Sequence, residues 1–172
     1  TDGGVSFTST ADLDATDWML NACPTSSPVG VVNGDSIMVV RRSGANVINE
    51  LYCSNVNATD LQKNYFNTLD PIGFGLQDKP EIAGDDNGYA VVWKDNRNSN
   101  TSCFIKWVYG GVSEVIELAD STTFGHKLSP DICLDYATGD YHMVYVASTQ
   151  HEVVYVKGSI MPLSIQDVKS EN

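Results

Sequence analysis

The chain has 172 residues, 42% of them hydrophobic, and 22 acidic against 10 basic side chains give it a formal net charge of −12. That charge opposes binding to a nucleic-acid backbone or to anionic lipid, so neither is expected as a partner. The apolar runs are far shorter than the roughly 20 residues of a membrane-crossing helix, so membrane insertion is not expected either.

The first predicted strands follow Pro28. Two apolar stretches flank Asn33-Gly34-Asp35, whose residues tolerate the positive φ of a tight hairpin turn. Aromatic and β-branched residues then predict two further strands before the next proline of the series. The four predicted strands of this unit are 29–32, 37–40, 49–54 and 65–69.

Pro80 and Pro130 open similar passages, 52 and 50 positions after the preceding proline of the series. A fixed period of this kind indicates a repeat architecture. The strands predicted for the second unit are 82–83, 89–93, 103–109 and 114–118. Those predicted for the third unit are 132–134, 141–146, 152–157 and 163–168.

No stretch has helical periodicity, so the predicted fold class is all-β. Four strands in a repeat of about 50 residues favour a partial β-propeller of about three four-stranded antiparallel blades. A β-sandwich is the alternative, since short strands with regular turns suit both architectures. The predicted blades are 17–70, 71–120 and 121–172, the last with a tail, and 1–16 is assigned to the end of a preceding blade.

Four cysteines, at positions 23, 53, 103 and 133, lack the spacing of a zinc site. Cys53, Cys103 and Cys133 lie in apolar strand-like stretches, where a free thiol behaves as a small buried hydrophobe. Disulfide bridging in an oxidising compartment is the alternative, with three possible connectivities.

The first residues resemble the Asp-box of sialidase-type (BNR) propellers. Asp2, Gly4 and Phe7 match its Asp-x-Gly-x-x-aromatic spacing, and a decayed copy repeats the Gly-Gly-Val-Ser run at 108–113. The carboxylate of such a box caps backbone N–H groups in a tight turn, so its role is structural. The start of the box lacks its usual Ser or Thr, which favours reading the chain as a fragment of a longer protein.

Two further passages carry the same resemblance. Residues 93–97, Trp-Lys-Asp-Asn-Arg, are similar to the end of the second strand in BNR-like blades. Residues 23–28 resemble an entry segment of uncharacterised bacterial sialidase-like surface proteins. The resemblance implies a secreted or cell-surface protein, with the periplasm as another compartment, and possible further blades or oligomers.

The catalytic set of sialidases cannot be assigned. The chain has three arginines, Arg41, Arg42 and Arg97, two of them neighbours on opposite faces of a strand, and it has no Arg-Ile-Pro motif. Asp95 is the one acidic residue that we single out as a catalytic candidate. We therefore expect a non-catalytic module.

In a propeller, the connections that lead from second to third strands gather on one face, together with those that enter each first strand. The predicted ligand-binding residues on that face are Trp18, Arg41, Arg42, Lys94, Arg97, His126 and Lys127. Such a cationic mouth could attract a carboxylate or sulfate. The alternative is a set of solvated loop charges, with Arg97 pairing with Asp95 and His126 as a hydrogen-bonding loop residue.

No cofactor is expected. Calcium at Asp85-Asp86-Asn87 or at Asp135 with Asp140 is an alternative to ordinary turn chemistry, although neither site has the spacing of a calcium loop.

The sequence thus favours a non-catalytic extracellular module that binds a glycan or a protein partner. One alternative is an exo-glycosidase of sialidase type whose other catalytic residues lie outside this chain. The other is a structural component that closes a ring with other chains.

Overall fold

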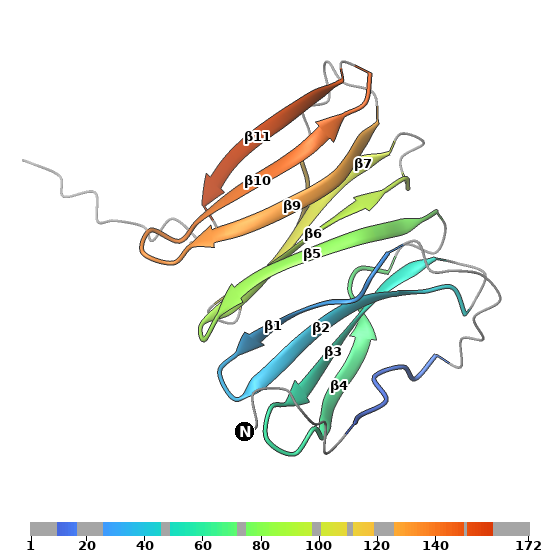
Figure 1. The fold of residues 1–172 in the computed structure, drawn as a ribbon, viewed down its shortest axis with the longest axis vertical. Coiled ribbons are helices and arrows are strands. Elements are labelled where there is room, and N and C mark those ends of the chain that lie inside the picture. The colour runs from blue at the N-terminus through green and yellow to red at the C-terminus, as the bar shows by residue number, and fades with distance from the viewer. Residues whose placement is uncertain are drawn as a thin grey trace, which may run out of the picture.

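The computed structural model describes residues 10–16, 26–45, 49–71, 75–97, 101–109, 112–118, 126–149 and 151–159. Within these ranges the chain is all-β and forms three separate antiparallel sheets (Figure 1). Each sheet takes its strands from one repeat in chain order. The all-β prediction is confirmed, and a two-sheet sandwich is not what these residues form.

The first sheet has the order β1-β2-β3-β4. Its strands are β1 (Val29–Asn33), β2 (Ser36–Ser43), β3 (Glu50–Asn57) and β4 (Lys63–Thr68). The pairing of Asn33 with Ser36 leaves a two-residue turn between β1 and β2. Gly34 has a φ of 58° in that turn, a conformation that glycine adopts without steric cost.

The second sheet has the order β5-β6-β7-β8, and the third has β9-β10-β11. The second sheet contains β5 (Gln77–Asp85), β6 (Gly88–Asp95), β7 (Ser102–Tyr109) and β8 (Val112–Glu117). The third contains β9 (Lys127–Asp135), β10 (Asp140–Ala147) and β11 (Glu152–Ser159). The fourth strand predicted at 163–168 lies outside the described residues.

The three sheets are stacked in chain order, and their first strands lie nearest to one another (Figure 1). β1 contacts β5, and β5 contacts β9. The second sheet therefore lies between the other two. This explains why β6 is an almost continuous apolar run rather than an alternating one, because it is buried on both faces.

One hydrophobic core lies between the first and second sheets. Successive side chains of a strand point to opposite faces, so alternate residues of β6 enter different cores. The buried members of this core are Met38, Val40, Leu51, Cys53, Leu69, Tyr89, Val91, Trp93 and Phe104. The rings of Trp93 and Phe104 are stacked with their centroids 5.9 Å apart.

A second hydrophobic core lies between the second and third sheets. It uses the other residues of β6, together with β7, β9 and β10. Its buried members are Ala90, Val92, Cys103, Ile105, Trp107, Ile132, Met143, Tyr145 and Ala147. Equivalent faces are thus used at both junctions.

The prolines at 80 and 130 lie inside strands rather than at their starts. β5 begins at Gln77 and β9 at Lys127, and the pairing register shifts where the chain passes through Lys79-Pro80 and Ser129-Pro130. Lys79 and Ser129 both have a φ of 51°, which is uncommon outside glycine. The two sheets therefore share a bulge at the same position of the repeat.

The opposite ends of the first strands are tied together through the hairpin turns. The Asn33 side chain donates to the carbonyl of Asp85, and the Gly34 N–H donates to Asp86 Oδ1 over 3.2 Å. The Tyr136 hydroxyl donates to the carbonyl of Gly84 over 2.8 Å. These bonds join each sheet to the next.

Candidate functional site

Arg41 lies near the end of β2, and its side chain contacts the segment 10–16, which lies against the first sheet. Its Nη2 atom lies 2.8 Å from Asp14 Oδ1 and 3.2 Å from the Leu13 carbonyl. The guanidinium also lies over the rings of Tyr52 and Phe66, with centroid distances of 5.8 and 5.2 Å. Arg41 therefore has internal partners on both sides.

Arg42 points to the other face of the sheet and meets the second sheet. Its Nη1 atom lies 3.1 Å from Asp78 Oδ1, and Lys94 Nζ lies 3.4 Å from Asp78 Oδ2. Burial acts to raise the pKa of Asp78, but hydrogen bonds and the charges of Arg42 and Lys94 outweigh it and lower that pKa. Arg42 thus links the first sheet to the second, whereas Lys94 pairs with Asp78 inside the second sheet.

Asp95 is fully buried at the end of β6 and accepts several hydrogen bonds. Its Oδ1 accepts from the Arg97 backbone N–H over 2.8 Å, and its Oδ2 accepts from Arg97 Nε over 2.9 Å. Oδ2 also accepts from Trp93 Nε1 over 3.1 Å and from Gln77 Nε2 over 3.3 Å. Burial acts to raise the pKa of Asp95, but the bonds from Arg97 and Trp93 outweigh it and lower that pKa.

The same cluster extends to the first sheet. Arg97 Nη1 lies 2.6 Å from Asp70 Oδ2, and the Gln77 side chain accepts from the Leu51 N–H over 2.9 Å. We call Asp70, Gln77, Trp93, Asp95 and Arg97 the buried lock. With no exposed surface, Asp95 cannot reach a substrate in this structure, and the Trp93 ring is core rather than a sugar platform.

Of the remaining predicted site residues, the structure describes His126 and the backbone of Lys127. His126 Nδ1 accepts a hydrogen bond from the Thr101 N–H over 3.2 Å, and His126 is exposed at the entry to β9. Lys127 begins β9, and its side chain is outside the description. Trp18, Asp2, Gly4 and Phe7 lie outside the described residues.

Hairpin-turn hydrogen bonds account for two of the calcium candidates. Asp85 Oδ1 accepts from the N–H groups of Asn87 and Gly88 over 2.8 and 3.2 Å. Asp135 Oδ1 accepts from the Ala137 N–H over 3.0 Å. These are the turn bonds that Asp side chains commonly make.

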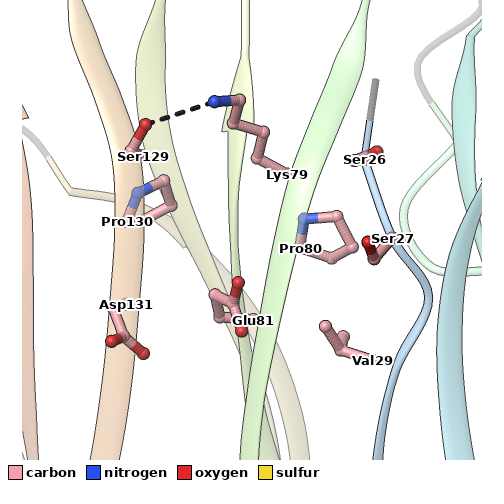
Figure 2. A pocket seen from close by; sticks show the side chains of 9 residues that line it. All are labelled: Ser26, Ser27, Val29, Lys79, Pro80, Glu81, Ser129, Pro130 and Asp131. Carbon is pink, nitrogen blue, oxygen red and sulfur yellow. Dashed lines mark hydrogen bonds between the residues drawn. The ribbon is translucent and has the colours of Figure 1, made fainter. Parts of the chain in front are cut away.

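A groove of about 350 Å³ lies where the first strands of the three sheets begin. Each repeat contributes the residues around its proline to the walls (Figure 2). The lining residues, which define the inner-strand groove, are Ser26, Ser27, Val29, Lys79, Pro80, Glu81, Ser129, Pro130 and Asp131. The groove is thus built from equivalent positions of three repeats.

Polar groups of both signs line this groove. Lys79 Nζ donates to Ser129 Oγ over 3.4 Å on one side of the two prolines, and Glu81 and Asp131 lie on the other side (Figure 2). Burial first, and the charge of Asp131 second, raise the pKa of Glu81. A groove lined by carboxylates, a lysine and serine hydroxyls is a typical environment for a polar ligand.

Sequence reasoning singled out the repeat prolines but not their neighbours. Aligning the three repeats could have indicated these neighbours. Val29, Glu81 and Asp131 occupy equivalent positions, because each directly follows a proline of the series. The sequence could not predict that β5 and β9 lie side by side and place Glu81 and Asp131 in the same groove.

No protein-family model matches the chain, and a search of curated proteins finds no match. Among the described residues there is no helix with the length and hydrophobicity needed to cross a membrane.

Proposed function

We propose that the three sheets are consecutive blades of a partial β-propeller. Support comes from their chain order, from the contacts between their first strands and from the use of equivalent faces at both junctions. A propeller places the first strands of its blades around a central channel. The inner-strand groove would then be part of the wall of that channel.

We further propose that the chain is a non-catalytic module that binds a glycan through the inner-strand groove. The observation that carries this is the groove itself, with carboxylate, ammonium and hydroxyl groups from three repeats around one hollow of about 350 Å³. Sugar hydroxyls both donate and accept hydrogen bonds, which matches such a mixed lining. Secretion or display at the cell surface remains part of this proposal.

The predicted cationic face is a weaker candidate for ligand binding than the inner-strand groove. Arg41, Arg42, Lys94 and Arg97 each have a carboxylate partner within the chain. An anionic ligand would have to compete with those carboxylates, at a cost in free energy. Alanine substitution of Arg42 or Arg97 would also remove its ion pair between the first and second repeats.

A glycan array followed by calorimetric titration tests the proposal. Glu81→Gln and Asp131→Asn should each weaken binding of the best array ligand at least tenfold, since each removes charged acceptors from the groove. Glu114→Gln, at an exposed position of β8, is the matched control and should bind like the wild type. Equal affinity in all four proteins, or no glycan binding at all, would refute it.

One observation favours a glycoside hydrolase as the second candidate. Glu81 has a raised pKa beside a second carboxylate, the arrangement from which glycosidases take an acid and a base or nucleophile. This candidate predicts turnover of a fluorogenic sialoside or another fluorogenic glycoside, with at least a hundredfold loss in Glu81→Gln. Binding without turnover would leave the non-catalytic module.

A further inference from the structure

Each of the first two sheets turns one face toward the next sheet in the chain. We call it the forward face. Its members on β2 and β6 occupy equivalent positions, Met38 and Val40 in the first sheet and Ala90 and Val92 in the second. These four side chains are at most 1% exposed, because the following sheet covers them.

The third sheet has the same forward face, but no described residue covers it. Val144 of β10 is paired with Tyr155 of β11, and Val146 is paired with Val153, so the four side chains share one face. Val153 is 73% exposed and Tyr155 is 59% exposed. Their counterparts in the second sheet, Cys103 and Ile105, are fully buried.

A shallow hollow marks the same face. It measures about 230 Å³ and is lined in part by Cys133, His142, Val144 and Tyr155. Cys133 was predicted to be buried, and that prediction is wrong, because Cys133 is exposed on this face. An apolar sheet face with a hollow is typical of a surface that receives another element.

We propose that the forward face of the third sheet is a docking surface for a further four-stranded sheet of the same repeat. The occupant's chemistry follows from what the earlier forward faces receive. The first receives Tyr89, Val91 and Trp93 of β6, and the second receives Met143 and Tyr145 of β10. The docking strand should therefore alternate aromatic and aliphatic side chains on one face.

Charged side chains also occupy this face. By alternation along β9 and β10 it carries Asp131, Asp135 and Asp140, and on β11 it carries Lys157, whose Nζ lies 2.7 Å from Asp140 Oδ2. The apolar residues of β10 and β11 named above form the uncharged part of the face, which a further sheet would cover. The corresponding receiving face of the first sheet is covered by 10–16, through Leu13 and Asp14, so a second copy of the chain cannot dock there without displacing that segment.

The experiment supplies the occupant within the full chain. We would compare residues 1–172 with the same chain extended by a second copy of residues 71–118, which contains β5 to β8. Docking should slow the alkylation of Cys133 at least tenfold, as measured by peptide mapping of the alkylated protein. It should also slow amide hydrogen exchange in β10 and β11. Buried Cys53 is the internal reference for unfolding.

The control extension carries Tyr89→Ser and Trp93→Ser in the added copy only, and should leave Cys133 as reactive as in the unextended chain. Equal reactivity of Cys133 in the extended chain and its control would overturn the proposal. So would an unextended chain whose mass doubles by light scattering while Cys133 becomes protected, because the occupant would then be a second copy.

Discussion

Two groups of carboxylates, one in the buried lock and one in the inner-strand groove, differ in the hydrogen-bond and charge partners that surround them. In the buried lock, Asp95 accepts hydrogen bonds from Arg97, Trp93 and Gln77, and its pKa is lowered. In the inner-strand groove, Glu81 lies beside Asp131, and its pKa is raised. The first arrangement stabilises the charged form of its carboxylate, whereas partial burial and a neighbouring carboxylate disfavour the charged form of Glu81 in the second.

The largest effect should come from the aromatic member of the lock. Trp93→Ala removes a fully buried indole and a hydrogen bond to Asp95, and should lower the free energy of unfolding by about 3–5 kcal/mol in chemical denaturation. Ile116→Ala, at an exposed position on β8, should change it by less than about 0.5 kcal/mol. Similar losses in both variants would mean that the core between the first two sheets is not formed.

Asp95→Asn should lower the free energy of unfolding by about 2–3 kcal/mol, because the neutral amide removes one of the two carboxylate partners of the half-buried Arg97 and weakens the hydrogen bonds to Arg97 and Trp93. Thermal and chemical denaturation both measure this loss. A variant of undiminished stability that has lost only glycosidase turnover would contradict the structural role of Asp95.

Acidification should destabilise the chain through Asp95 of the buried lock and through Asp78. Asp95 and Asp78 have folded pKa values below their ordinary 3.8, so their contribution is present above pH 3.8 and is lost as the pH falls through the folded values. Stability measured between pH 5 and pH 2 should fall less steeply in Asp95→Asn than in the wild type. Parallel curves would show that Asp95 is not coupled to folding.

The smallest effect should come from the groove and have the opposite sign. Because the folded pKa of Glu81 lies above its ordinary 4.5, its contribution is lost as the pH rises through the folded value. Glu81→Gln should therefore stabilise the chain at pH 7, by less than about 0.5 kcal/mol after solvent screening, and not at pH 4. A variant less stable at pH 7 would place Glu81 among the stabilising residues.

Local chemistry made much of the fold predictable. The Asn33-Gly34-Asp35 turn and the apolar runs around it predicted the first hairpin, and the same pattern recurred in the other repeats. The pairing of Arg97 with Asp95 was readable as an alternative because the residues are two positions apart. Contacts between residues far apart in the chain could not be predicted, and for this reason the sequence did not reveal that Asp14 pairs with Arg41.

The candidate site was harder to predict for the same reason. Glu81 and Asp131 are 50 positions apart, and their proximity depends on β5 lying beside β9. The exposure of Cys133 likewise depends on whether another sheet covers its face. Alternation along β9 predicts which face Cys133 occupies, but not whether that face is covered.

The bonds between the hairpin turns have a mechanical consequence. They join the sheets at the ends remote from the groove, through Asn33, Gly34 and Tyr136. The sheets are also joined near the groove, where Arg42 Nη1 lies 3.1 Å from Asp78 Oδ1 and Lys79 Nζ donates to Ser129 Oγ. Neighbouring sheets are therefore tied at both ends of their first strands, so polar bonds as well as the two cores set the spacing of the repeats.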